Sequence, residues 1–187
     1  MEYNVEEYIQ LGSETMDKAI VHLKHELAKI RTGKASVSLL DDILVDYYGS
    51  QVPISQVANL GTADARTITI QPWEKSMLPV IEQSIFAANL GLTPQNDGEF
   101  IRINIPPLTE ERRIELARQA KHEGEEAKVS IRNSRHKVMD FIKKEVKSGY
   151  PEDVAKRKEK EVEDIVKGHV TEIDELILAK EKDIMKV

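Results

Sequence analysis

Three stretches of the chain carry apolar residues at the three- and four-residue steps typical of amphipathic helices. The first covers 9–30, the second begins after Pro107 and the third follows Pro151. The second stretch runs without proline for about forty residues, roughly 60 Å at the α-helical rise. Because a single helix of that length and polarity is not stable in water, we expect the three helices to pack together as a bundle.

Each predicted helix has its own series of inward positions. The series are Ile9, Met16, Ile20, Leu23, Leu27 and Ile30; Ala117, Ala120, Gly124, Ala127, Ile131, Ser134, Val138 and Phe141; and Val162, Ile165, Val166, His169, Ile173, Leu176 and Ile177. Small residues in the first half of the second series let another helix approach closely. Thr109 is a suitable N-cap for the second helix, and Ser148–Pro151 should end it.

Residues 31–105 show signals of β-strands instead. The strand signals lie at 43–54, which reads as a hairpin around Gly49–Ser50, at 66–71, and at 95–105. A helix is predicted over 76–90, with Pro79 in its first turn and Gly91 at its end. The chain is therefore predicted to be α+β, with a three-helix bundle of 1–30 plus 106–187 and an inserted β/α/β domain of 31–105.

Two chain crossings join these predicted domains. These crossings, Arg31–Lys34 and Asn104–Leu108, are expected to lie side by side as a paired linker. They contain Thr32–Gly33 and Pro106–Pro107, which are residues of the kind that end helices and strands. Two parallel segments allow rotation of the domains while limiting their separation. The predicted hinge consists of Arg31, Thr32, Gly33, Lys34, Asn104, Ile105, Pro106 and Pro107.

Composition narrows the class of protein. The 187 residues are 40% hydrophobic, 32% charged and only 5% aromatic, with no cysteine for disulfides or thiolate metal sites. The acidic N-terminus lacks the basic and apolar segments of a signal peptide. No apolar run approaches the roughly twenty residues of a membrane span. We therefore expect a soluble cytoplasmic protein without membrane contact.

Motifs for catalysis and ligand binding are incomplete. TGKAS at 32–36 resembles the end of a phosphate-binding loop, but Ala28 replaces its first glycine and Ala35 follows its lysine. His22 and His25 have no further recognisable metal ligands nearby. No serine, histidine and carboxylate set has a recognisable context. We therefore expect no enzyme, cofactor or metal site, with a hydrolase hidden in the insert as an alternative.

Two single residues have competing interpretations. Trp73 is the only tryptophan, and packing at a strand-to-helix turn is favoured over a role as a binding anchor. His169 lies on an apolar stripe and is interpreted as a packed core residue, with a role as a metal ligand as the alternative.

A basic run stands out against the net charge of −6. Residues 128–147 carry seven Lys or Arg against two acids. The basic side chains that share one broad side of the predicted helix are Arg118, Lys121, Lys128, Arg132 and Arg135. No acid falls between Lys128 and Lys137, so we expect a positive centre whose guanidinium groups project into solvent. The side is either an ordinary charged face or a docking surface for the phosphates of structured RNA.

Several separated motifs together resemble the bacterial ribosome recycling factor family. They are KIRTGKAS, SLLDDILVDYYGS, QPWEKSM, LGLTPQNDG, IRINIPPLTEERR, IRNSR and AKEKDIM, in matching order from about residue 15 to the C-terminus. The resemblance implies an L-shaped, two-domain fold with tRNA-like dimensions. It also implies a non-catalytic monomer that binds large-subunit rRNA at the intersubunit face. With elongation factor G and GTP, such a factor splits the post-termination ribosome, so that mRNA and tRNA leave.

The resemblance also assigns residues. Arg132 in IRN matches the family's critical arginine, Arg135 matches a basic position, and Arg31, Thr32 and Gly33 match the linker. The departures from the family pattern are Lys34 for arginine, His136 for arginine and Lys137 for an acid. Contacts around 136–140 therefore stay open. The alternative from another class is a helical adaptor or chaperone-like interaction protein without RNA contact.

Overall fold

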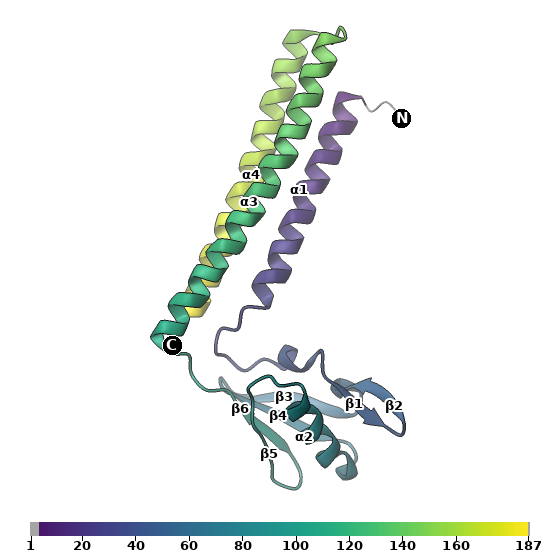
Figure 1. The fold of residues 1–187 in the computed structure, drawn as a ribbon, viewed down its shortest axis with the longest axis vertical. Helices are drawn as coiled ribbons and strands as arrows, with labels where there is room; N and C mark the ends of the chain where they lie inside the picture. Colours follow the sequence, from purple (N-terminus) through teal and green to yellow (C-terminus); the bar gives the residue numbers. More distant parts are fainter. Residues whose placement is uncertain (1–3, 187) are drawn as a thin grey trace. The chain divides into compact units, whose positions relative to one another are not determined.

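The computed structural model describes residues 4–186, which form two compact units. One unit joins the residues up to Arg31 with those from Glu110 onward, and the other is Thr32–Thr109. The first unit contains the three long helices α1 (Val5–Ala28), α3 (Glu110–Lys147) and α4 (Glu152–Met185). All three pairs of these helices are in contact, and Figure 1 shows α3 and α4 side by side. The predicted three-helix bundle is therefore confirmed.

The ends of the three helices follow local signals. In α1 the side chain of Asn4 accepts a hydrogen bond of 2.8 Å from the N–H of Glu7, and the Glu7 carboxylate accepts one from the N–H of Asn4. This reciprocal cap starts α1 four residues before the predicted stripe. The α3 helix begins directly after Thr109, as predicted, and α4 begins directly after Pro151.

Packing in the bundle follows the predicted stripes. Every predicted position in α1 is buried, and no predicted position in α3 or α4 is exposed. Near the α3–α4 connection, one cluster joins all three helices through Val5, Ile9, Val138, Met139, Ile142, Ala155 and Val162. The two long helices α3 and α4 approach closely at Gly124, where an added Cβ would lie 2.7 Å from Ile177 Cγ1. Gly124 of α3 therefore faces α4.

The second unit is an α+β domain with two antiparallel sheets. The strands β1 (Leu44–Tyr47) and β2 (Ser50–Pro53) form the predicted hairpin. A four-stranded sheet has the order β3-β4-β6-β5, from β3 (Ala58–Asp64), β4 (Thr67–Pro72), β5 (Pro94–Asn96) and β6 (Ile101–Asn104). Short 3₁₀ turns occupy Val37–Leu40, Ile54–Gln56 and Lys75–Met77, and the last leads into α2 (Leu78–Ala87).

The core of this unit lies between its sheet and α2 (Figure 1). Ile68 and Ile70 of β4 and Ile101 and Ile103 of β6 are fully buried, together with Ile81 and Ile85 of α2. The edge strands β3 and β5 were missed in the sequence, because neither carries an alternating apolar pattern. β3 buries only Ala58 and β5 only Pro94, so burial does not select apolar residues along these edges.

The interpretation of Trp73 as a packed residue is wrong. Its side chain was expected to pack at the strand-to-helix turn, but the residue is 67% exposed. Pro72 before it is buried, and successive residues of an extended segment point to opposite sides, so Trp73 points outward. The next residue, Glu74, instead accepts hydrogen bonds from the hydroxyls of Tyr47 at 3.0 Å and Tyr48 at 2.9 Å. These bonds raise the pKa of both tyrosines and tie the β1–β2 hairpin to the end of β4.

Candidate functional site

The predicted basic side of α3 exists, but most of its cations have partners on α4. Lys121 Nζ lies 3.7 Å from Glu181 Oε1, and Lys128 Nζ lies 2.7 Å from Asp174 Oδ1. Arg135 Nε donates to Glu163 Oε1 at 2.8 Å, and Arg135 Nη2 contacts the same oxygen. These hydrogen bonds raise the pKa of Lys128, through Asp174, and of Arg135, through Glu163.

The expectation of solvent-directed guanidinium groups is therefore wrong for Arg135, and the expected positive centre is neutralised in part at Lys128 as well. The side chains of Lys128 and Arg135 are only 21% and 34% exposed. Acids of α4 pair with these cations, and Lys128 also lies 3.6 Å from Glu125 on α3 itself. Because α3 and α4 are antiparallel neighbours, cations seven residues apart on α3 face acids spaced seven to eleven residues apart on α4. The pairs are Lys121 with Glu181, Lys128 with Asp174 and Arg135 with Glu163.

Arg132 differs from its neighbours in the row. It is exposed, and in the part of the chain that the structure describes it makes no hydrogen bond or ion pair. Arg118 is likewise exposed and has no partner within residues 4–186. Lys121 has an acid nearby, but its side chain remains 67% exposed. The cations available for an anionic ligand on this side of α3 are therefore Arg132, Arg118 and Lys121.

A groove between α3 and α4 adds residues that sequence reasoning missed. It has a volume of about 590 Å³ and is lined by Arg135, His136, Met139, Asp140, Lys143, Lys156, Glu159, Lys160 and Glu163. No ion pair of Lys143, Lys156 or Lys160 is present in the described residues, whereas Glu163 is bound to Arg135. Lys156 and Lys160 are one turn apart on α4, which is the only signal in the sequence that they share a face.

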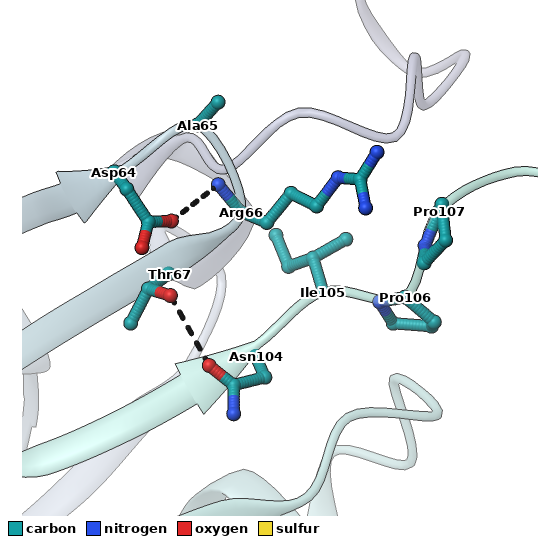
Figure 2. Close-up of a pocket in the computed structure, with 8 residues that line it drawn as sticks. All are labelled: Asp64, Ala65, Arg66, Thr67, Asn104, Ile105, Pro106 and Pro107. Atoms are coloured by element: carbon teal, nitrogen blue, oxygen red, sulfur yellow. Dashed lines mark hydrogen bonds between the residues drawn. The ribbon is translucent and has the colours of Figure 1, made fainter. Parts of the chain in front are cut away.

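The predicted hinge residues lie near the ends of the second unit, apart from Arg31, the last residue of the first unit's N-terminal segment. Gly33 has a φ of +77°, and an added Cβ would lie 2.9 Å from Leu108 Cγ, so the entering and leaving segments lie side by side. Thr32 is partly buried and Lys34 is exposed. Asn104 ends β6, and Ile105 continues into Pro106 and Pro107 (Figure 2). An open pocket of about 620 Å³ is bounded by Asp64–Thr67 and Asn104–Pro107.

The histidines show no metal-site geometry. Among residues 4–186, no group of three or more His, Asp or Glu side chains is arranged to hold a metal ion. His22 and His25 are exposed on α1. His169 joins α4 to α1, because its Nδ1 lies 2.7 Å from the Ile165 carbonyl oxygen and its Nε2 lies 2.7 Å from Asp17 Oδ1. Its side chain is mostly buried, in agreement with the interpretation as a packed residue. Within the same residues, no helix is long and apolar enough to cross a membrane.

Comparisons with known proteins agree on one family. Residues 23–185 match the family described as "Ribosome recycling factor". The ribosome-recycling factor of Phocaeicola vulgatus is 54% identical over 176 residues, which cover 94% of this chain and 95% of that protein. The ribosome-recycling factor of Bacteroides fragilis is 52% identical over 184 residues, which cover 98% of this chain and 99% of that protein.

Solved structures give the same assignment. A solution structure of the ribosome recycling factor is 38% identical, with a TM-score of 0.78 and full coverage of both chains. A second match, at 39% identity and a TM-score of 0.63, covers 98% of this chain and 100% of the other. It comes from models of the T. thermophilus ribosome recycling factor and the E. coli elongation factor G bound to the E. coli post-termination complex. With its bundle, its inserted domain and nearly its whole length matched, this chain belongs to the ribosome recycling factor family.

Proposed function

We propose that this protein recycles ribosomes after termination. It binds the post-termination complex and, with elongation factor G and GTP, promotes subunit splitting and the release of mRNA and tRNA. The observation that carries this proposal is the nearly full-length match to ribosome-recycling factors, one of which is described with elongation factor G on a post-termination complex. The protein acts in the cytoplasm and is no enzyme itself, since the hydrolysis of GTP belongs to the elongation factor.

The bundle docks on large-subunit rRNA through the basic side of α3. Arg132 supports this role best, because it is exposed and has no partner within the described chain. An arginine can bind a phosphate through two parallel hydrogen bonds. Arg118 and Lys121 extend the row from Arg132 by about four turns toward the N-terminus of α3. Few aromatic side chains accompany these cations, which favours recognition of the RNA backbone and shape over base stacking.

Lys128 and Arg135 contribute to this docking surface in a different way from Arg132. The partner carboxylates Asp174 and Glu163 are 59% and 48% exposed. Ion pairs at the surface contribute only about 0–1 kcal/mol in water, so a phosphate can compete for either cation. In the free protein, however, both cations hold α4 against α3 through Asp174 and Glu163. The groove lysines Lys143, Lys156 and Lys160 extend the docking surface onto α4.

The linker supports the mechanical part of the proposal. The bundle stays anchored on rRNA while elongation factor G pushes the inserted domain. Two chain segments joined side by side, with Gly33 against Leu108, can transmit such a force. Rotation at the linker then drives the subunits apart.

A splitting assay tests the function directly. Post-termination ribosomes are mixed with this protein, a matched elongation factor G and GTP, and light scattering follows subunit separation. We expect splitting that requires all three components. A protein that sediments with ribosomes but leaves them intact under every condition would overturn the recycling function. If it stays in the supernatant even at low salt, the adaptor without RNA contact is correct.

A further inference from the structure

The turn between β3 and β4 holds both segments that connect the inserted domain to the rest of the chain. The N–H of Ala35, on the entering segment, donates to the Ala65 carbonyl at 2.8 Å. The N–H of Ile105, on the leaving segment, donates to the Arg66 carbonyl at 2.7 Å. Two successive carbonyl groups of one turn therefore bind the two segments, although these are seventy residues apart in sequence.

Asp64 sets the conformation of this turn. Its Oδ1 accepts a hydrogen bond of 2.8 Å from the N–H of Arg66, as Figure 2 shows. That bond is the main reason why the pKa of Asp64 is lowered. On the neighbouring strand, the hydroxyl of Thr67 donates to Asn104 Oδ1 at 3.1 Å. A carboxylate that accepts a backbone N–H two residues on is a common way to fix a tight turn.

The two held segments differ in stiffness beyond the turn. The leaving segment continues from Ile105 into Pro106 and Pro107, whose rings fix φ and restrict each preceding residue. The entering segment has Gly33 at φ +77°, a conformation that is readily accessible only to glycine. The backbone at Gly33 is therefore less restricted by its own residue type than the backbone at Pro106 and Pro107.

We propose that Asp64 is a positioning residue for the hinge. Through the β3–β4 turn it fixes Ala35 and Ile105 to the inserted domain, which places the pivot outside both residues. Asn104 and Ile105, predicted as hinge residues, then move with the inserted domain. This inference rests on the proposed function for its mechanical consequence, whereas the turn itself is testable in the free protein.

The structural part is tested by amide hydrogen exchange of the full chain, measured by NMR. In D64A we expect the Ala35 and Ile105 amides to exchange about tenfold faster, because the turn that holds them loses its side-chain hydrogen bond. D64N should keep part of the protection at every pH, because its neutral side-chain oxygen can still accept the Arg66 N–H, without the charge that strengthens the bond. A matched control is D97A, since Asp97 Oδ1 accepts the N–H groups of Glu99 and Phe100 in the β5–β6 turn, which holds no linker.

The pH dependence of the protection of these two amides tests the role of Asp64 independently. A carboxylate whose pKa is lowered by folding stabilises the folded state above its unfolded pKa, and the effect disappears as pH falls through the folded pKa. The charged group beside Asp64 is the guanidinium of Arg66, which stays protonated throughout. Protection factors of Ala35 and Ile105 should therefore fall at acidic pH in the wild-type protein and not in D64N.

The functional part is tested by splitting and by ribosome affinity. In D64A, splitting should slow by more than the affinity falls, because the docking surface on α3 is untouched. Unchanged exchange at both amides in D64A, or the same change in D97A, would overturn the positioning role. Faster exchange with normal splitting would overturn its mechanical consequence. If even the wild-type protein fails to split ribosomes, the proposed function is wrong, while the exchange data still decide the role of Asp64.

Discussion

At the scale of single residues, three cations of α3 that look alike in sequence have different environments. Lys128 and Arg135 are bound by Asp174 and Glu163, whereas Arg132 between them is exposed and unpaired in the described chain. The cost of losing each side chain should differ accordingly. A paired side chain contributes to holding α4 in place, while an unpaired one is available for a ligand.

Arg132→Ala should weaken ribosome binding by about 1–3 kcal/mol, the range for a hydrogen bond to a charged group. The salt dependence of binding should lose about one unit of slope, because one phosphate contact disappears. The free energy of unfolding should change by no more than about 0.5 kcal/mol. Filter-binding or sedimentation assays over a salt series measure the affinity and its salt dependence, and calorimetry measures the free energy of unfolding. Arg132→Lys should recover only part of the lost binding free energy if Arg132 binds a phosphate through two parallel hydrogen bonds, because lysine cannot form such a pair.

Arg135→Ala is the matched control, since it removes the same side chain three residues away. It should lower the unfolding temperature by breaking the pair with Glu163, and affect binding less than Arg132→Ala does. Equal binding losses in the two variants would contradict the distinction drawn from the structure. Unaltered binding in the Arg132 variant would exclude this face of α3 as the docking surface.

At the scale of elements, the linker combines a segment with a glycine at positive φ and a segment with two successive prolines. Gly33 has a positive φ and lies against Leu108, while Pro106 and Pro107 restrict the returning segment. A branched side chain at position 33 disfavours this backbone and meets Leu108 at once. The geometry of the two segments therefore depends on the absence of a side chain at Gly33.

Gly33→Val should slow subunit splitting more than it weakens ribosome binding, because it alters the linker and leaves α3 intact. Stopped-flow light scattering gives the splitting rate, and sedimentation gives the affinity. Gly98→Val is a suitable control, because it places the same side chain at a glycine of positive φ in the β5–β6 turn, away from the linker. Equal losses of affinity and rate, or no loss of either, would show that the linker is no hinge.

At the scale of the whole molecule, the protein has charged surfaces and two linker segments, and no group of three or more His, Asp or Glu side chains in residues 4–186 is arranged to hold a metal ion. In the proposed mechanism, the protein acts by binding and by transmitting force. The energy for splitting is then supplied by elongation factor G, and the protein contributes position and stiffness.

The isolated protein should therefore show no saturable site for GTP, ATP or zinc tighter than about 100 μM, roughly −5.5 kcal/mol. The physical reason for the nucleotides is the incomplete phosphate loop at 28–36, where Ala28 and Ala35 replace required residues. For zinc, the reason is that no group of three or more His, Asp or Glu side chains within 4–186 is arranged to hold a metal ion. Calorimetric titration of each ligand into the full chain measures this. A defined micromolar nucleotide site would reopen the hydrolase alternative in the inserted domain.

Much of the fold was predictable because it depends on local signals. Apolar stripes, the proline and glycine boundaries and the Thr109 cap placed all three long helices within a few residues. The central strands β4 and β6 were found because burial on one face imposes alternation on their isoleucines. The edge strands β3 and β5 bury a single residue each, so their pairing leaves no comparable pattern in the sequence.

The chemistry of the candidate site depended on tertiary structure. The sequence by itself determined that a run of cations lies on one side of α3, since that follows from helical spacing alone. Which of them are paired depends on α4, whose acids lie 28 to 60 residues away in sequence and meet α3 only when the helices pack antiparallel. The role of Asp64 is non-local in the same way, because the turn it shapes binds two segments through backbone groups. Backbone hydrogen bonds have no residue signature, and only the folded chain brings these groups together.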